Sequence, residues 1–391
     1  MNFNIISFLI VSFFISLADL ASEILAPALS IINIKFSYLN TTVHQYVAGL
    51  FSLGYALGTI FFGILADKIG RRKVLVIGAA IFFISNLICY LFFNNLFLFL
   101  FGRFLQGIGA AAAILIGYSS LRDAYNGVIF SKMMSKMDFF ISIFPIGAPL
   151  IGLLFLSSAH GIEYIFLSLS VCSAICLYFI FIKFKDTLDK AEHAQDNFIT
   201  LLKSYLLLFK EKKFIKYAMI KGLISAYLWG DAANFPLVVT TGLHETSFNY
   251  AIFIVMHLFW CLIGIFINYH YVTKYGVKKM LSFGLSLEVV SELGLLFICY
   301  YFNVDSVITY GFLISISDIA LTLVLTNAAV MATMSLPKNK IGRANAIISF
   351  LNSALTMVFI MLSAYFFNGT FLPTIVMASF CAIIAYMLFR L

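Results

Sequence analysis

The chain has 391 residues, of which 62% are hydrophobic and only 11% are charged, and its formal net charge is +8. Soluble globular domains carry about 25% charged residues, so this composition excludes them and indicates a protein that crosses the membrane many times. The basic residues lie in short segments between apolar runs, which does not support nucleic-acid binding. All six cysteines fall inside apolar runs, and we interpret them as packing residues rather than as metal ligands.

Apolar runs of about 20 residues mark helices that span a bilayer. The sequence predicts an all-α polytopic membrane protein with twelve such spans. Their ranges are 5–33, 45–66, 73–93, 96–120, 132–157, 162–183, 214–239, 248–271, 278–301, 306–335, 342–367 and 371–389. The first run is too long for a signal-peptide core and has no basic region before it, so we expect it to remain as the first helix.

The distribution of lysine and arginine predicts the orientation of the chain, because cytoplasmic loops carry an excess of both. An even number of spans places the two termini on one side. If the termini are cytoplasmic, the inner loops contain nearly all of the basic loop residues and the outer loops contain only Lys35. We therefore predict that both termini are cytoplasmic.

One long polar stretch, residues 184–213, interrupts the apolar pattern. It divides the chain into six spans in 1–183 and six spans in 214–391, which we expect to form two six-helix bundles. Within this linker, residues 198–206 have a helical apolar pattern. The segment either lies along the inner membrane surface or serves only as a connection.

The two halves of the chain contain an internal repeat. The loop at 65–75 aligns with the loop at 271–281 at a constant offset of 206 residues, and Lys, Gly, two basic positions and Leu coincide. Both loops follow the second span of their half. A parallel repeat of this kind is typical of transporters built as two bundles around a site near the membrane midplane.

The first apolar run contains a stripe of polar residues. Ser12, Ser16, Asp19, Glu23 and Ser30 recur at helical spacing and so share one face. A carboxylate at mid-bilayer costs about 2.5–3.5 kcal/mol on insertion scales, and two ionised carboxylates one turn apart repel. We hypothesise that the two acids carry a proton or meet a cationic solute. The alternative is a buried pair satisfied by neighbouring helices, with one acid permanently neutral.

The loop after the second span has the sequence GILADKIGRRK at 63–73. Gly63 permits close helix approach, Gly70 supplies a tight turn, and Asp67 ends a helix beside Arg71 and Arg72. Every position resembles the signature loop of the major facilitator superfamily. The resemblance implies the fold of that superfamily and a cytoplasmic latch, formed by Asp67 and the basic residues, that is closed in the outward-facing state. The alternative is simple anchoring by the basic residues.

The fourth span contains Arg103 within GRFLQGIGA at 102–110. This segment resembles the superfamily's fourth-span motif, whose arginine is implicated in proton coupling. An arginine at this depth needs a carboxylate or backbone carbonyls as partners. Asp19 or Glu23 would be its partner if spans one and four face one cavity, whereas the alternative is an arginine that snorkels to the outer face.

The fifth span resembles the superfamily's antiporter motif in part. Its segment 145–152 includes Gly147, Pro149 and Gly152, which we expect to bend the helix and to let it pack closely. Ala148 and Phe144 stand where the motif has glycine.

Several local matches narrow the resemblance to the bicyclomycin-resistance-type (Bcr/CflA) drug-efflux branch. Glu23 stands at the acid of an acid-x-x-x-Pro-Ala-Leu pattern, and Arg122 with Asp123 matches an Arg-Asp pair that closes span four. Further matches lie at 148–152, 186–188 and 342–346. The resemblance implies a monomer in a bacterial inner membrane, in contact with lipid and a small-molecule substrate. It implies no cofactor, since the proton gradient is the energy source.

In the superfamily's arrangement, spans one, four, seven and ten line the cavity. The lining candidates are Asp19, Glu23, Arg103, Trp229, Asp231, Asn234 and Asp318. Trp229 either stacks on a planar or cationic solute or anchors the chain at the membrane interface. Glu288 and Glu292 form an acidic pair in the peripheral span nine, and we expect them to make inter-helix hydrogen bonds. The histidines, His257 and His270 among them, form no metal set in the sequence.

These observations favour a secondary active transporter, a proton-coupled antiporter that exports small amphipathic organic compounds by alternating access. The alternative on the same fold is a dedicated metabolite carrier, such as a siderophore exporter or a nutrient importer, in which Arg103 and Lys221 hold an anionic group. A third alternative is an integral-membrane enzyme or a sensor. We do not expect an enzyme, because no nucleophile, metal set or cofactor loop is visible in the sequence.

Overall fold

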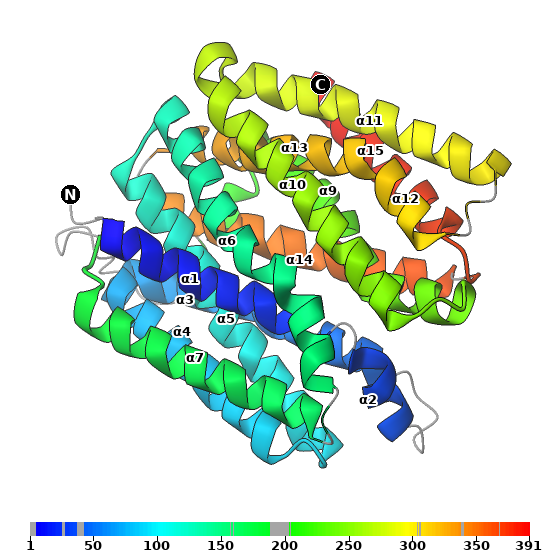
Figure 1. The fold of residues 1–391 in the computed structure, drawn as a ribbon. Coiled ribbons are helices and arrows are strands. Elements are labelled where there is room, and N and C mark those ends of the chain that lie inside the picture. The colour runs from blue at the N-terminus through cyan, green and yellow to red at the C-terminus, as the bar shows by residue number, and fades with distance from the viewer. Residues whose placement is uncertain are drawn as a thin grey trace. The chain divides into compact units, whose positions relative to one another are not determined.

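A computed structural model describes residues 5–25, 28–36, 43–156, 158, 160–187, 203, 205–302, 304, 306–337, 340–366 and 368–391. Within these residues the chain forms helices and no strand (Figure 1). Ten of the described helices are long and apolar enough to cross a membrane. The predicted all-α polytopic class is confirmed, as expected for a chain in lipid, where a helix satisfies its backbone polar groups within its own segment.

One compact unit comprises Met1–Asn126, Ile143–Glu211 and Leu336–Phe350. Its helices are α1 (Ile5–Glu23), α2 (Leu29–Lys35), α3 (Val43–Ile69), α4 (Arg71–Leu91), α5 (Leu96–Ala124), α7 (Gly161–Lys183), the second part of α6 (Gly127–Leu156) and the first part of α14 (Ile341–Tyr365). Helix α5 packs against α3 and α4 (Figure 1). Gly54 and Gly107 permit the α3–α5 approach, because a Cβ at either would lie 2.0 Å from a backbone oxygen of the other helix.

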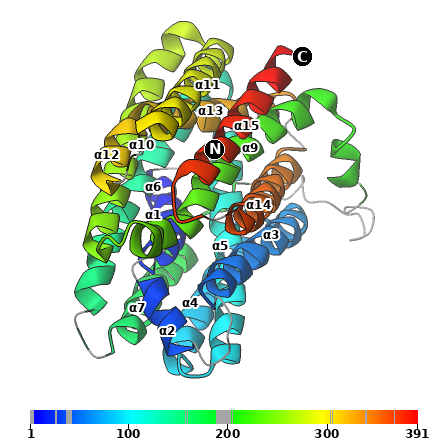
Figure 2. The same cartoon turned by 90° about the vertical axis from the view of Figure 1, so that its right-hand side faces the viewer.

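The other compact unit comprises Gly127–Ser142, Lys212–Ser335 and Leu351–Leu391. Its helices are α9 (Lys212–Leu237), the π-helix η4 (Val238–Gly242), α10 (Ser247–Tyr275), α11 (Val277–Phe302), α12 (Val307–Leu313), α13 (Ser315–Met334), α15 (Leu372–Arg390), the first part of α6 and the rest of α14. Helix α13 packs against α9, α10 and α11, while α15 packs against α9 and α11 (Figure 2). This central place explains why most of α13 is buried.

The first predicted span is wrong as a single helix over 5–33, because α1 ends at Glu23 and α2 begins at Leu29. Pro27 lies between them in the sequence, and proline disfavours helical conformation before it and removes a backbone donor. Ser30 therefore belongs to α2 and does not continue the polar stripe of α1. The tenth predicted span is likewise divided, between α12 and α13.

Helices α6 and α14 each contribute to both units, so the compact units follow packing rather than chain order. The predicted boundaries at 183 and 214 stay predictions. Of the predicted amphipathic segment 198–206, only residues 203, 205 and 206 lie inside the described residues.

The two aligned loops of the internal repeat have the same backbone conformation. Gly70 has φ 91° and ψ 162°, and Gly276 has φ 82° and ψ 155°. Each glycine separates two long helices, α3 from α4 and α10 from α11. Because residues with a Cβ rarely adopt such positive φ, glycine is required at both turns.

Candidate functional site

The polar stripe of α1 lies against the protein. Glu23 is 9% exposed, and Asp19 is half-buried. The Asp19 carboxylate is near enough to act electrostatically on Tyr55 of α3, whose hydroxyl hydrogen-bonds Ser349 of α14. Asp19 thus lies near polar groups supplied by other helices of the same unit.

Arg103 of α5 is buried, with 2% of its surface exposed. Its Nε donates to the carbonyl of Val47 at 3.4 Å, and its Nη1 donates to the carbonyl of Ala21 at 3.3 Å and to Gln106. The guanidinium also lies over the ring of Phe51, 4.8 Å from its centroid. The positive charge is therefore held by dipoles and an aromatic face.

The sequence predicts either a carboxylate or backbone carbonyls as partners of Arg103. In the structure the partners are carbonyls. The ion pairs among the described residues do not include Arg103, and hence neither Asp19 nor Glu23 pairs with it. The reason is packing: α3 approaches α5 so closely that a backbone carbonyl reaches the guanidinium, and α1 offers the carbonyl of Ala21.

A chain of buried amides extends from Arg103. Gln106 Nε2 donates to Asn86 Oδ1 at 2.7 Å, and Asn86 Nδ2 donates to the carbonyl of Phe82 at 2.7 Å. Gln106 and Asn86 are fully buried. Every polar end of Asn86 therefore has a partner, as a buried amide requires.

The loop at 63–73 is tied to the end of α5 and to the segment after α7. Arg71 donates to both oxygens of Asp123, through Nε at 2.6 Å and Nη2 at 3.2 Å. Asp186 accepts from the backbone N–H groups of Arg71 at 3.1 Å and Arg72 at 3.3 Å, so it supplies the acceptors that the first turn of α4 lacks. Thr187 adds a hydroxyl contact to Asp123 at 3.2 Å.

Gly63 of α3 lies against Ala346 of α14. A Cβ there would lie 2.7 Å from the Cβ of Ala346 and 2.7 Å from the hydroxyl of Tyr205, so this position requires a small residue. Arg122 donates to the carbonyl of Tyr125 at 3.1 Å. The side chain of Asp67 lies outside the described part of the structure.

Helix α6 runs unbroken through its predicted bend motif. A Cβ at Gly147 would make an ordinary contact of 3.7 Å with Ile151 of the same helix. Among the described residues, Gly147 therefore makes no close approach to another helix. Gly152 is buried, and the side chain of Pro149 lies outside the described residues.

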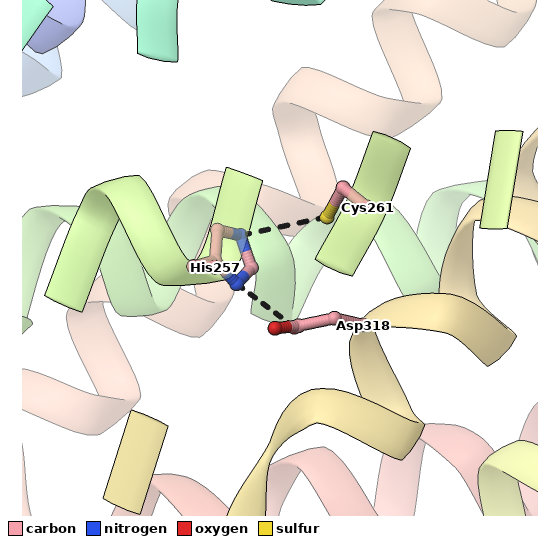
Figure 3. A group of neighbouring side chains, drawn as sticks. All are labelled: His257, Cys261 and Asp318. Atoms are coloured by element: carbon pink, nitrogen blue, oxygen red, sulfur yellow. Dashed lines mark hydrogen bonds and ion pairs between the residues drawn. The ribbon is translucent and has the colours of Figure 1, made fainter. Parts of the chain in front are cut away.

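Two of the four candidate residues in the second half have described side chains, and these differ in exposure. Trp229 is 42% exposed, whereas Asp318 is fully buried. The side chains of Asp231 and Asn234 lie outside the description. Asp318 Oδ1 is 2.8 Å from His257 Nδ1, and the other ring nitrogen of this histidine is 4.0 Å from Cys261 Sγ (Figure 3).

Two charged side chains inside predicted spans interact with each other. Asp138 is not among the candidates from the sequence, and Lys221 was considered there only for an anion carrier. Asp138 of α6 accepts a hydrogen bond from Thr326 of α13 at 3.0 Å, and it interacts electrostatically with Lys221 of α9. The signal for Asp138 was present, since it is a carboxylate within the predicted span 132–157. Nothing in the sequence indicates that His257 and Asp318 meet.

Amides and hydroxyls connect α6 to α10 and α13 within the second unit. Asn268 Nδ2 donates to Ser135 Oγ at 2.8 Å, and Asn327 Nδ2 donates to Asn268 Oδ1 at 2.6 Å. Ser131 Oγ donates to Asn327 Oδ1 at 3.3 Å. All four side chains are fully buried, so these hydrogen bonds are shielded from solvent.

Comparison with known proteins identifies the family. The model of the Major Facilitator Superfamily matches residues 9–359. A bicyclomycin resistance protein homolog of Haemophilus influenzae is 25% identical over 256 residues, which cover 64% of this chain and 63% of the relative. The multidrug resistance protein MdtL of Citrobacter koseri is 29% identical over 179 residues, 45% of this chain and 44% of that protein. The match thus spans less than two thirds of either relative's length.

Solved structures share the fold over nearly the whole chain. The human organic anion transporter MFSD10 (TETRAN) superposes with a TM-score of 0.75 at 15% identity, covering 98% of this chain and 99% of that one. The fucose:proton symporter FucP of Escherichia coli superposes with a TM-score of 0.73 at 14% identity, covering 99% and 98%. The predicted family is confirmed: this chain is a multi-pass membrane protein that belongs to the Major Facilitator Superfamily.

Proposed function

We propose that the chain is a proton-coupled antiporter that exports small amphipathic organic compounds by alternating access. Membership of a transporter superfamily supplies the general activity. The names of the relatives, which refer to bicyclomycin and multidrug resistance, support the class of solute. The resemblance to bacterial efflux proteins also supports an inner-membrane location with cytoplasmic termini.

The observation that carries this proposal is the buried position of Glu23 on a helix that would otherwise be suited to lipid. A carboxylate is neutral when protonated and attracts cationic groups when ionised. One carboxyl group can therefore hold a proton or a solute cation but not both. Inward movement of the proton is thereby coupled to outward movement of the solute. Asp19, one turn earlier, is the second candidate for this role.

Alternating access is supported by the kind of contact that joins the first six predicted spans to the last six. In one unit α6 meets α13 through the hydrogen bond between Asp138 and Thr326, and in the other α14 meets α5 through Asn345, which donates to Ser119 at 3.1 Å. A protein hydrogen bond contributes about 0.5–1.5 kcal/mol net, because water replaces it when the contact opens. Contacts of this type can break and reform in each cycle.

The latch is the second support for the cycle. The bidentate pair of Arg71 with Asp123, and the cap that Asp186 places on α4, fix the loop at 63–73 to two neighbouring segments. We propose that this arrangement closes the cytoplasmic side and that it loosens when the carrier opens inward.

The test is transport by the purified full-length protein in liposomes with an imposed pH gradient. We expect Glu23→Gln to reduce gradient-driven export of bicyclomycin and a panel of cationic dyes to the level of protein-free liposomes, since the amide cannot exchange a proton. Glu163→Gln, at the first turn of α7 beside His160, is the matched control and should transport normally.

Two outcomes would revise this assignment. Coupling that survives Glu23→Gln but is lost in Asp19→Asn would move the proton carrier to Asp19. A wild-type protein without gradient-dependent flux for any solute of the panel would overturn the antiport proposal itself.

Arg103 favours a second candidate function, a carrier of organic anions, because its charge is held without a carboxylate partner. MFSD10, one of the similar structures, is described as an organic anion transporter. Competition assays separate the two candidates. Displacement of a bound dye by carboxylate-bearing metabolites, lost in Arg103→Gln, would favour the anion carrier.

A further inference from the structure

A second group of buried polar side chains belongs to the unit that does not contain α1 and Arg103. It draws on four helices, α9, α10, α11 and α13. Its members are Tyr227, His257, Cys261, Glu288, Glu292, Ser317 and Asp318. Glu288 and Asp318 have no exposed surface, and Glu292 is 2% exposed. The sequence predicts inter-helix hydrogen bonds for the two glutamates, but not the histidine and aspartate beside them.

The hydrogen bonds around Ser317 require a proton on a glutamate. Its Oγ lies 3.0 Å from Glu288 Oε1 and 2.6 Å from Glu292 Oε1. A serine hydroxyl carries one hydrogen, which can be donated to only one of these oxygens in an ordinary hydrogen bond. The other contact is a hydrogen bond if the glutamate itself donates. Tyr227, which also contacts Glu288 Oε1, donates its own hydrogen and does not change this count.

The balance of charge leads to the same conclusion. Three acids face one basic side chain, because His257 is the sole base within ion-pair distance of Glu288, Glu292 or Asp318 in the described part of the chain. If all were ionised, the cluster would hold two uncompensated negative charges on buried side chains. Burying an unpaired carboxylate is far more costly than protonating it.

Three carboxylate oxygens in the cluster accept no hydrogen bond from the described residues. Glu288 Oε2, Glu292 Oε2 and Asp318 Oδ2 are buried and have no hydrogen-bond partner among the described residues. A bare anionic oxygen in such a position costs its full desolvation energy. A proton on either oxygen of the same carboxyl group removes the charge that makes the position unfavourable.

The arrangement of His257 argues against a metal ion as the missing cation. His257, Cys261 and Asp318 are close enough to suggest one, but Asp318 and Cys261 contact different nitrogens of the imidazole (Figure 3). Asp318 lies at Nδ1, and Cys261 lies at Nε2. A metal ion binds one ring nitrogen at about 2.0–2.1 Å, whereas here each ring nitrogen faces a different partner. An imidazole with a partner at each nitrogen instead links two groups for proton exchange.

We propose that this cluster is a proton-binding site separate from the acids of α1, and that the Glu288–Ser317–Glu292 bridge holds an exchangeable proton. The groups that face the bridge are Tyr227 from α9, His257 and Cys261 from α10, and Asp318 from α13. The binding of this proton does not depend on transport, whereas its use in the transport cycle rests on the proposed function.

The test measures protonated carboxyl groups directly, by infrared absorption of the purified full-length protein in H₂O and D₂O over a range of pH. We expect a band from a protonated carboxylic acid that persists when Asp19→Asn and Glu23→Gln are combined. It should be lost in the double variant Glu288→Gln/Glu292→Gln and unchanged in the control Glu163→Gln. An unchanged band in the Glu288→Gln/Glu292→Gln protein would overturn the proposal.

Two further measurements keep the result decisive. If the double glutamine variant does not fold, Ser317→Ala replaces it: loss of the bridge should move the band, and an unmoved band would count against the bridge. Stoichiometric binding of Zn²⁺ to the wild-type protein, abolished in His257→Ala, would overturn the proton site in favour of a metal site.

The link to transport is tested separately in liposomes. If the bridge takes part in the cycle, Glu292→Gln should lower the number of protons moved per solute while solute flux continues. An unchanged ratio would confine the proton to a structural role and would overturn its use in coupling. Absence of wild-type flux would defeat the proposed function but leave the infrared result standing.

Discussion

The two halves of the repeat carry different chemistry at an equivalent buried position. Asn86 in α4 and Glu292 in α11 follow Gly70 and Gly276 at the same spacing. Asn86 accepts a hydrogen bond from α5 at 2.7 Å, and Glu292 contacts α13 at 2.6 Å. One half therefore places a neutral amide where the other places an acid.

Their partners are equivalent as well. Gln106 and Ser317 follow the N-cap residues Asn95 and Ser306 at the same spacing, and both caps accept from the backbone three residues later. The repeat has thus kept the hydrogen-bond scaffold between two helices while its chemistry changed. In the first half the charge belongs to a guanidinium, which does not release its proton in proteins. In the second half it belongs to acids, which can exchange theirs.

Exchange of residues between the equivalent positions should have the largest effect. Asn86→Glu places a carboxylate in a fully buried position and removes the donor to the carbonyl of Phe82. We expect a loss of about 3 kcal/mol or more in the free energy of unfolding, measured as a fall in the thermal midpoint of the purified protein. Glu292→Gln, which keeps size and hydrogen bonding, should cost less than about 1 kcal/mol. Equal midpoints for Asn86→Glu and wild type would mean that the two positions are interchangeable.

The two glycine turns should respond alike, with an intermediate effect. Gly70→Ala and Gly276→Ala each force a Cβ into a conformation at φ 91° or φ 82°. We expect a loss of about 1–3 kcal/mol in the free energy of unfolding for each variant. Gly294→Ala, in a helix and with open space around it, is the control and should be neutral or slightly stabilising. A large effect at only one turn would contradict the structural repeat.

Substitutions in the two basic loops of the repeat should have the smallest effects on stability, and the two loops should respond differently. Arg71→Gln breaks the pair with Asp123, which we expect to lower the free energy of unfolding by about 1–2 kcal/mol and to slow transport in liposomes. The repeat-equivalent loop has the exposed Lys278, and Lys278→Gln should change stability by less than about 0.5 kcal/mol. If both variants slow transport equally, the latch is not specific to the first half.

Features set by local chemistry were predictable from the sequence. The long helices follow from apolar runs of membrane-spanning length, and Gly70 and Gly276 follow from the aligned loops. The division of the first span was also readable in principle, because Pro27 cannot continue a helix without losing a hydrogen bond. The acids of α1 were found because a carboxylate is conspicuous in an apolar run.

Partners that depend on packing were not predictable. Hydropathy does not tell which face of α5 meets α3, so the carbonyl of Val47 could not be assigned to Arg103. The pairing of His257 with Asp318 joins helices far apart in the chain, and no spacing rule connects them. The proposed roles of Asp67, Pro149, Asp231 and Asn234 stay predictions, since their side chains lie outside the described residues.

Helix α6 belongs to one compact unit up to Ser142 and to the other from Ile143 onward. A continuous helix bends most easily where its backbone hydrogen bonds are interrupted. Pro145 and Pro149 lie just beyond the change of unit, and each removes one rung of the backbone ladder that stiffens a helix. We therefore expect α6 to bend at a lower energetic cost near Pro145 and Pro149 than elsewhere along its length.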